Sequence, residues 1–167
     1  VLYIYRDGRD VAASLIHKYD ILTDEKLTHL RGSEMRLGRP FDERYVPWWV
    51  EDGRDEAFIQ SPPYVRAIWM WKYMVSRCHE AFSAPAIKDR GQVLLLRYED
   101  FMREPMTYGR AVLDHLGASP TPAFKRRLHK AHTRSIGKHR SRPAHEIRAA
   151  EQVAGAELEL YGSPPGP

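Results

Sequence analysis

The pattern of hydrophobic and polar positions predicts two short buried strands that lie far apart in the chain. Residues 1–5 (VLYIY) and 92–101 (QVLLLRYEDF) are apolar runs rich in residues that favour strands. Continuous apolar runs of this length are typical of strands covered on both faces, as in a parallel sheet. We therefore expect both strands to lie inside a sheet.

Helical patterns follow each predicted strand. Asp7 is a favourable N-cap for the first helix, and Asp10 places a carboxylate in its first turn, where the helix dipole favours it. A long helix is predicted from Pro63 onward by its apolar spacing. Further helices are expected at 105–117, which ends at a glycine, at 122–129 and at 143–161. This order predicts an α/β protein with a parallel sheet.

The chain is expected to form one partial domain over residues 1–161. Residues 20–61 have no clear periodicity and contain several glycines and prolines, so we expect an irregular insertion there. Residues 162–167 (GSPPGP) are expected to be a frayed tail. Two strands are too few to close a parallel-sheet core, so we expect further strands upstream of Val1 and interpret the chain as the C-terminal part of a longer protein.

Composition narrows the class of protein. Of the 167 residues, 43% are hydrophobic and 29% charged, a balance typical of globular domains. The net charge of +4 suits an anionic ligand. No apolar run approaches the roughly 20 residues of a membrane helix. The single cysteine, Cys78, excludes an internal disulfide and favours a reducing compartment, so we expect a cytoplasmic protein. The scattered histidines give no metal motif, and no metal is expected.

Arg6 and Ser14 are the first candidates for ligand binding. Arg6 ends the first predicted strand, and Ser14 lies in the second turn of the helix that follows. The carboxyl end of a parallel strand beside a helix N-terminus favours an anion, and a guanidinium and a hydroxyl both suit phosphate. In the alternative interpretation, Arg6 forms a structural ion pair with Asp10 or Glu99, and Ser14 is a small residue packed on a sheet.

The stretch YRDGRDVAASL, residues 5–15, resembles the signature of sulfotransferases that use 3′-phosphoadenosine 5′-phosphosulfate (PAPS). In that family a strand ends in Arg, a Pro or Gly follows two residues later, and an Asp and a helical Ser come next. Arg6, Gly8, Asp10 and Ser14 fill these places in order. The resemblance implies that Arg6 and Ser14 hold the 3′-phosphate of the donor.

A second motif, VLLLRYEDFMREP at 93–105, resembles the strand of that family that ends in Tyr-Glu-Asp. The resemblance implies that Tyr98 lies near the adenine of PAPS. The alternative is an ordinary core tyrosine.

A third stretch, RSIGKHR at 134–140, resembles the C-terminal loop that closes over the 3′-phosphate. The resemblance implies contacts from Gly137 and Lys138, with Arg134 a weaker candidate. His139 stands where many family members have Trp, which departs from the stacking part of the loop. The alternative is an ordinary basic surface loop.

The resemblance also implies a fold and a chemistry. The fold would be a P-loop-NTPase-like three-layer parallel sheet flanked by helices, incomplete at its N-terminus. The sequence contains neither a Pro-Lys-Ser-Gly-Thr loop nor GxxxxGK[ST], which would grip the 5′-phosphosulfate. The general base is expected upstream of Val1, so no catalytic residue is assigned, and the truncated chain alone is expected to be inactive.

The sequence therefore predicts a PAPS-dependent sulfotransferase that acts on a hydroxyl or amine of a small-molecule or carbohydrate acceptor. Trp48 and Trp49 could line the acceptor pocket, although both could equally be structural. The alternative function is a non-catalytic remnant that binds a nucleotide or a polyanion through the basic run 125–134. No nucleic-acid motif is present. A P-loop kinase fragment would leave the Tyr-Glu-Asp strand and the Arg–Ser pair unexplained.

Overall fold

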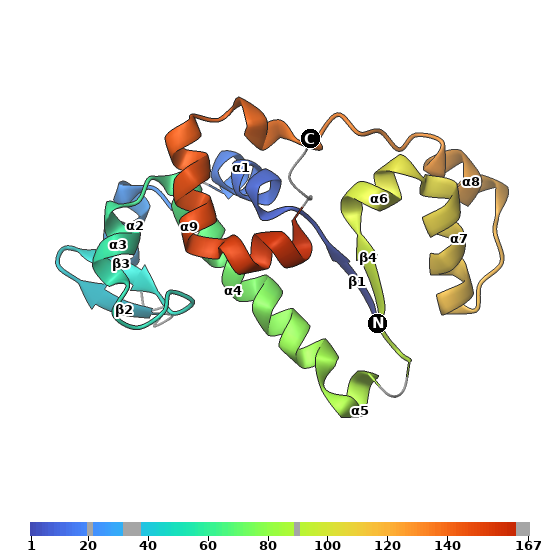
Figure 1. Cartoon of the computed structure of the whole chain (residues 1–167), viewed down its shortest axis with the longest axis horizontal. Helices are drawn as coiled ribbons and strands as arrows, with labels where there is room; N and C mark the ends of the chain where they lie inside the picture. Colours follow the sequence, from blue (N-terminus) through green and yellow to red (C-terminus); the bar gives the residue numbers. More distant parts are fainter. Residues whose placement is uncertain (20–21, 32–37, 89–90, 163–167) are drawn as a thin grey trace. The chain divides into compact units, whose positions relative to one another are not determined.

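The two predicted strands pair with each other in parallel. In the computed structural model, β1 (Leu2–Tyr5) and β4 (Leu94–Arg97) run side by side (Figure 1). Their register places Leu2 opposite Leu94 and Tyr5 opposite Arg97. The parallel pairing that the sequence predicted is confirmed. The P-loop-like three-layer sheet is not confirmed, because β1 and β4 form a sheet of two strands within the described residues.

The strands are less buried than the sequence predicted. Leu96 is buried, but Leu2, Ile4 and Leu95 are 37%, 50% and 53% exposed. Each strand has a single strand neighbour within the described residues, which are 1–19, 22–31, 38–88 and 91–162. The expectation of strands covered on both faces is therefore wrong for these three side chains.

The chain divides into two units. Unit 1 consists of Val1–Arg6 and Cys78–Gly137, and unit 2 consists of Asp7–Arg77 and Lys138–Pro167. Helix α4 (Pro63–Ser83) contributes to both, because the division falls after Arg77.

Unit 1 adds helices to the parallel pair. They are α5 (Pro85–Lys88), α6 (Tyr98–Arg103), α7 (Pro105–Leu116) and α8 (Pro122–Leu128). Two of them, α6 and α7, contact β4. Gly117 ends α7 in the left-handed region at φ 64°, as predicted from sequence. The strand predicted at 92–101 is wrong beyond Arg97, because Tyr98 begins a helix. Its first turn holds Glu99 and Asp100, where the helix dipole favours acidic side chains.

Unit 2 contains more regular structure than the sequence predicted. The segment 20–61, expected to be irregular, contains α2 (Asp24–Arg31), β2 (Gly38–Phe41), β3 (Arg44–Pro47) and α3 (Asp55–Gln60). The strands form an antiparallel hairpin. Their sequences, GRPF and RYVP, mix charge and proline, so neither gives a recognisable strand pattern. Residues 20–21 and 32–37 lie outside the described part.

The remaining elements of unit 2 agree with the sequence analysis. They are α1 (Gly8–Tyr19), the 3₁₀ turn η1 (Lys138–Ser141) and α9 (Ala144–Tyr161), and α1 contacts both of the others. Ala154 departs from helical geometry inside α9. Of the tail expected at 162–167, only Gly162 is among the described residues.

A buried arginine organises the core of unit 2. The Arg66 side chain is 2% exposed and donates to the carbonyl oxygens of Leu22 and Phe58 and to Oδ1 of Asp24. These bonds tie α4 to α2 and to the end of α3. Since buried charges require such partners, Arg66 fixes the position of the elements that the sequence left unassigned.

The tryptophans of unit 2 differ in exposure. Trp49 is buried, with its ring edge-on to Phe58 at 5.4 Å, and Trp69 is buried and donates to Glu51 at 2.7 Å. Trp48 is 48% exposed. Trp49 therefore belongs to the core, and Trp48 alone of this pair can meet a ligand.

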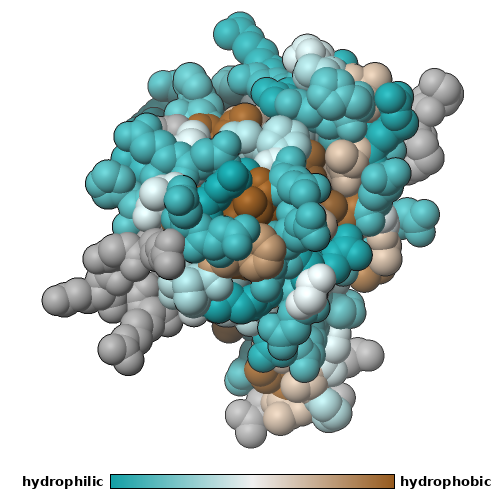
Figure 2. Space-filling view, turned by 90° about the vertical axis from the view of Figure 1, so that its left-hand side faces the viewer, coloured by the Kyte–Doolittle hydropathy of each residue, from teal (hydrophilic) through white to brown (hydrophobic). Residues whose placement is uncertain are grey.

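Most of the surface that faces the viewer in Figure 2 is hydrophilic, with hydrophobic residues in limited areas between polar ones. Among the helices of the described ranges, none is both long enough and apolar enough to cross a bilayer.

Candidate functional site

In unit 1, the guanidinium of Arg6 meets an aromatic ring and a loop. One terminal nitrogen of Arg6 donates to the carbonyl oxygen of Ser135, and the guanidinium carbon lies 4.7 Å from the centre of the Tyr98 ring. The Tyr98 hydroxyl lies 3.0 Å from the hydroxyl oxygen of Ser135. We call Arg6, Tyr98 and Ser135 the Arg6 cluster.

The parallel strands explain how Arg6 and Tyr98 come together. Tyr5 and Arg97 are opposite each other at the ends of β1 and β4, and Arg6 and Tyr98 are the next residues. The carboxyl ends of parallel strands meet at one edge of the sheet, which is the usual position of ligands in such folds. The structure thus brings together two of the residues that the sequence selected.

The third member, Ser135, was not predicted. It lies two residues before Gly137, which adopts φ 77°, and the turn is closed by a bond from the Ile136 amide to the Thr133 carbonyl. A left-handed φ favours glycine, so Gly137 fits the turn that carries Ser135. The sequence signal for Ser135 was indirect: the hydroxyl of a partly buried tyrosine needs a partner.

Charge around the cluster is positive. Glu99 is fully buried, and its two carboxylate oxygens lie 3.9 Å from Nε of Arg6 and 3.4 Å from Nε of Arg97. One carboxylate thus stands between two guanidinium groups. The ion pair of Arg6 with Glu99, which the sequence analysis gave as the structural alternative, is therefore present. Its N···O distance of 3.9 Å is close to the upper limit of about 4 Å for such pairs. The Arg6 side chain is 19% exposed, so an anion from solvent can reach it.

In unit 2, Asp7 caps α1 as predicted. Its Oδ1 accepts a bond from the Arg9 amide at 2.9 Å, and both of its carboxylate oxygens accept bonds from the Arg9 guanidinium. These bonds raise the pKa of Arg9 above its ordinary value. The Tyr64 hydroxyl donates to the Arg9 carbonyl, and burial raises the pKa of Tyr64, which keeps it a donor. The start of α1 is therefore held rigidly.

Asp10 links α1 to η1. Its Oδ1 accepts a bond from the His139 amide at 3.0 Å and lies 2.9 Å from Nδ1 of the same residue. Asp10 is 2% exposed and His139 is 6% exposed. The sequence assigned Asp10 to the helix dipole and to the family motif, or alternatively to an ion pair with Arg6, and it treated His139 as a departure from the family pattern. Both residues instead form a buried contact that holds the basic loop on α1.

Ser14 and Lys138 lie on the two elements joined by this contact. Ser14 is one turn after Asp10, is exposed, and donates to the Asp10 carbonyl at 3.3 Å. Lys138 is exposed and immediately precedes His139. Ser14 and Lys138 belong to unit 2, whereas the Arg6 cluster belongs to unit 1. The chain passes from unit 1 to unit 2 directly after Arg6 and again directly after Gly137. A single phosphate site that includes Arg6 and Ser14 remains a prediction.

Arg134, the weaker candidate from the sequence, is exposed in the loop before Ser135. Within the ranges that the structure describes, no group of three or more His, Cys, Asp or Glu side chains is arranged to hold a metal ion.

Gly8 is needed for packing. A Cβ atom at Gly8 would lie under 3.0 Å from ring atoms of Trp71, which is itself buried. We expect Gly8→Ala to lower the free energy of unfolding by about 1–3 kcal/mol, because the indole ring must shift within a packed core. The measurement is urea unfolding followed by tryptophan fluorescence.

Gly155→Ala is the matched control, since a Cβ there meets no atom within 4 Å. This substitution in α9 is expected to stabilise the chain by about 0.5–1 kcal/mol through reduced entropy of the unfolded state. Equal effects of the two substitutions would contradict the packing role of Gly8.

Comparison with known families decides what kind of domain carries these residues. A family model described as a sulfotransferase domain matches residues 1–153. The chain belongs to the sulfotransferase family. The match includes the Arg6 cluster, α1 and the loop with Gly137 and Lys138, and it ends within α9. Neither the curated proteins nor the solved structures contain a match.

This membership confirms the resemblance that the ordered motifs indicated. It also supports a transferase activity for the sulfotransferase domain that contains both the Arg6 cluster and the Asp10–His139 contact.

Proposed function

We propose that this sulfotransferase domain uses PAPS as the sulfuryl donor and acts on a hydroxyl or amine of a small-molecule or carbohydrate acceptor. The Arg6 cluster is the observation that carries the proposal. It combines a partly exposed arginine side chain with an aromatic ring at the end of a parallel strand. These are the two groups that an adenosine 3′-phosphate requires: a cation for the phosphate and a ring beside the adenine.

In the proposed complex, phosphate oxygens replace the Ser135 carbonyl as the acceptor for Arg6. A charged acceptor gives a shorter and stronger bond to a guanidinium than a carbonyl does, which favours this exchange. Ser14 and Lys138 add a hydroxyl and an ammonium donor to the same phosphate, and Gly137 lets the loop turn toward it. The contact between Asp10 and His139 positions both elements that carry these donors.

The proposed reaction is an in-line transfer. The acceptor oxygen or nitrogen forms a bond to sulfur while the bond from sulfur to the 5′-phosphate oxygen breaks, and the electron pair leaves with 3′-phosphoadenosine 5′-phosphate (PAP). The acceptor proton passes to a base, to which we assign no residue of this chain. Cationic side chains that compensate charge on the departing phosphate lower the barrier.

Trp48 is the residue that we propose for acceptor contact. Its ring is half exposed and stands edge-on to Tyr73 with 4.8 Å between ring centres. Exposed aromatic faces suit sugar rings and phenols.

Non-catalytic polyanion binding is the alternative, and one observation favours it. Arg126, Arg127 and Lys130 line a hollow of about 300 Å³ beside Ala123 in unit 1. A cluster of this kind attracts any polyanion through charge alone.

Titration calorimetry separates the two functions. We expect PAP to bind at least about ten-fold more tightly than AMP, which lacks the 3′-phosphate, because one charge-assisted phosphate contact contributes about 1.5–3 kcal/mol. Heparin serves as the polyanion probe, and its binding should fall steeply with salt. Equal affinity for PAP and AMP, together with salt-dependent heparin binding, would contradict the proposed function and support the alternative.

A further inference from the structure

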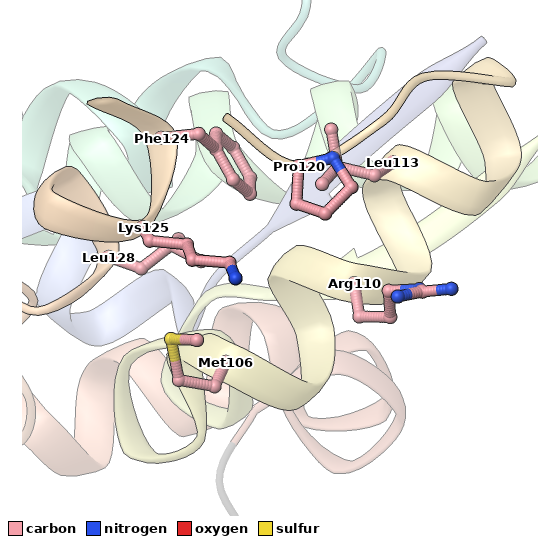
Figure 3. Close-up of a pocket in the computed structure, with 7 residues that line it drawn as sticks. All are labelled: Met106, Arg110, Leu113, Pro120, Phe124, Lys125 and Leu128. Atoms are coloured by element: carbon pink, nitrogen blue, oxygen red, sulfur yellow. The ribbon is translucent and has the colours of Figure 1, made fainter. Parts of the chain in front are cut away.

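A hollow of about 270 Å³ lies between α7 and α8 in unit 1 (Figure 3). Its apolar walls come from both helices and from the loop that connects them: Met106, Leu113, Pro120, Phe124 and Leu128. None of the residues assigned to the PAPS site lines it, although Lys125 begins the basic run of the alternative function. The hollow is therefore separate in its residues from the Arg6 cluster.

Local packing forms the hollow. The helices touch where Leu128 packs on Gly109, since a Cβ at Gly109 would lie 2.5 Å from a Leu128 methyl carbon. The Thr121 hydroxyl accepts a bond from the Phe124 amide at 3.1 Å and fixes the start of α8. Met106 stays 44% exposed, so the described residues leave this wall of the hollow open to solvent. A pocket with walls fixed in this way exists before any ligand arrives, which lowers the cost of binding.

One cation points into the hollow. In Figure 3 the ammonium group of Lys125 extends among the apolar side chains, whereas the guanidinium of Arg110 points away. Nε of Arg110 donates to Asp114 at 2.9 Å. Lys125 makes no ion pair with a carboxylate among the residues that the structure describes. The charge available inside the hollow is thus that of Lys125.

The chain around α8 is strongly basic. Between His115 and Gly137, all within unit 1, there are five Lys or Arg residues and no Asp or Glu. Three of them, Arg126, Arg127 and Lys130, line a second hollow at α8 and the residues just after it. A positive field of this extent favours an anionic ligand over a neutral one.

We propose that the hollow between α7 and α8 binds a small organic anion that has one apolar body and one anionic head. The apolar body contacts Phe124, Leu113 and Met106, and the head pairs with Lys125. The volume is near the lower limit of ordinary ligand pockets, about 300 Å³, so a one- or two-ring aromatic sulfonate, sulfate ester or carboxylate is the fitting class. This site is additional to the proposed nucleotide site and does not depend on it.

Naphthalene-2-sulfonate is the probe for this site. We expect it to bind the 167-residue chain about ten-fold more tightly than neutral 2-naphthol or inorganic sulfate, because each of these lacks one of the two contacts. Calorimetry gives the affinities, and amide chemical shifts in NMR spectra should change for residues of α7 and α8. Comparison with 2-naphthoate then distinguishes a sulfonate head from a carboxylate head.

Two substitutions on one helix provide the mutational test. Lys125→Gln is expected to weaken naphthalene-2-sulfonate binding about five- to ten-fold, because it removes the cation that pairs with the head. Arg127→Gln removes the same charge outside this hollow and is expected to change the binding less than about two-fold. Saturating PAP should leave the probe in place. Equal effects of the two substitutions, binding of 2-naphthol as tight as that of the sulfonate, or displacement by PAP would each overturn the proposal.

Discussion

Replacement of Asp10 by alanine is expected to lower the free energy of unfolding by about 2–4 kcal/mol, because buried donors that lose their acceptor cost about 1–3 kcal/mol each. Oδ1 of Asp10 accepts a hydrogen bond from the His139 amide and lies within hydrogen-bond distance of the ring Nδ1 of His139. Both residues are almost fully buried. Alanine cannot accept either bond. The measurement is urea unfolding followed by the fluorescence of the unit 2 tryptophans.

Two variants isolate the contribution of the contact. Glu25→Ala removes an exposed acidic residue from the first turn of α2, and it should cost no more than about 0.5 kcal/mol. Asp10→Asn retains one side-chain oxygen as an acceptor and should fall between the two. If Asp10→Ala proves as mild as Glu25→Ala, the contact between Asp10 and His139 does not hold the loop on α1.

Replacement of Arg6 by alanine is expected to weaken PAP binding by roughly ten- to a hundred-fold, since a charge-assisted contact to phosphate contributes about 1.5–3 kcal/mol. Arg6 is the cation of a cluster that also presents the Tyr98 ring. Its loss removes the proposed 3′-phosphate contact and the cation beside the Tyr98 ring. Titration calorimetry of PAP into the wild-type and variant chains gives the ratio of dissociation constants.

Arg148→Ala is the control for net charge. Arg148 is exposed on α9 and carries the same charge as Arg6. Its removal should change PAP affinity by less than about three-fold, in line with the small energies of exposed charges. Comparable losses from both substitutions would mean that PAP responds to overall charge and not to the Arg6 cluster.

Local sequence signals located many of the element ends correctly. Asp7 caps α1, Pro105 begins α7, and Gly117 ends it in a left-handed conformation. Each of these positions depends on one residue type with one conformational property, so the sequence alone was sufficient. The resemblance implied that Arg6 and Tyr98 both contact the nucleotide, and the structure brings them together because both follow strands that end at the same sheet edge.

Other features depended on tertiary contacts that no local pattern reports. The hairpin of β2 and β3 has strands of four residues, and the buried Arg66 that fixes its neighbours resembles any polar position in a helix. The partnership of Asp10 with His139 joins residues 129 positions apart. Tyr98 was expected in a strand because the apolar run continues to it, but the acidic first turn begins a helix there.

The measurement that tests the central claim most directly is the ratio of AMP to PAP dissociation constants in the wild-type chain and in Arg6→Ala. If Arg6 binds the 3′-phosphate, the wild-type ratio is about ten or more, and in Arg6→Ala it falls toward one because the two ligands differ only in that phosphate. An undiminished ratio in the variant would contradict the assignment of Arg6 to the 3′-phosphate.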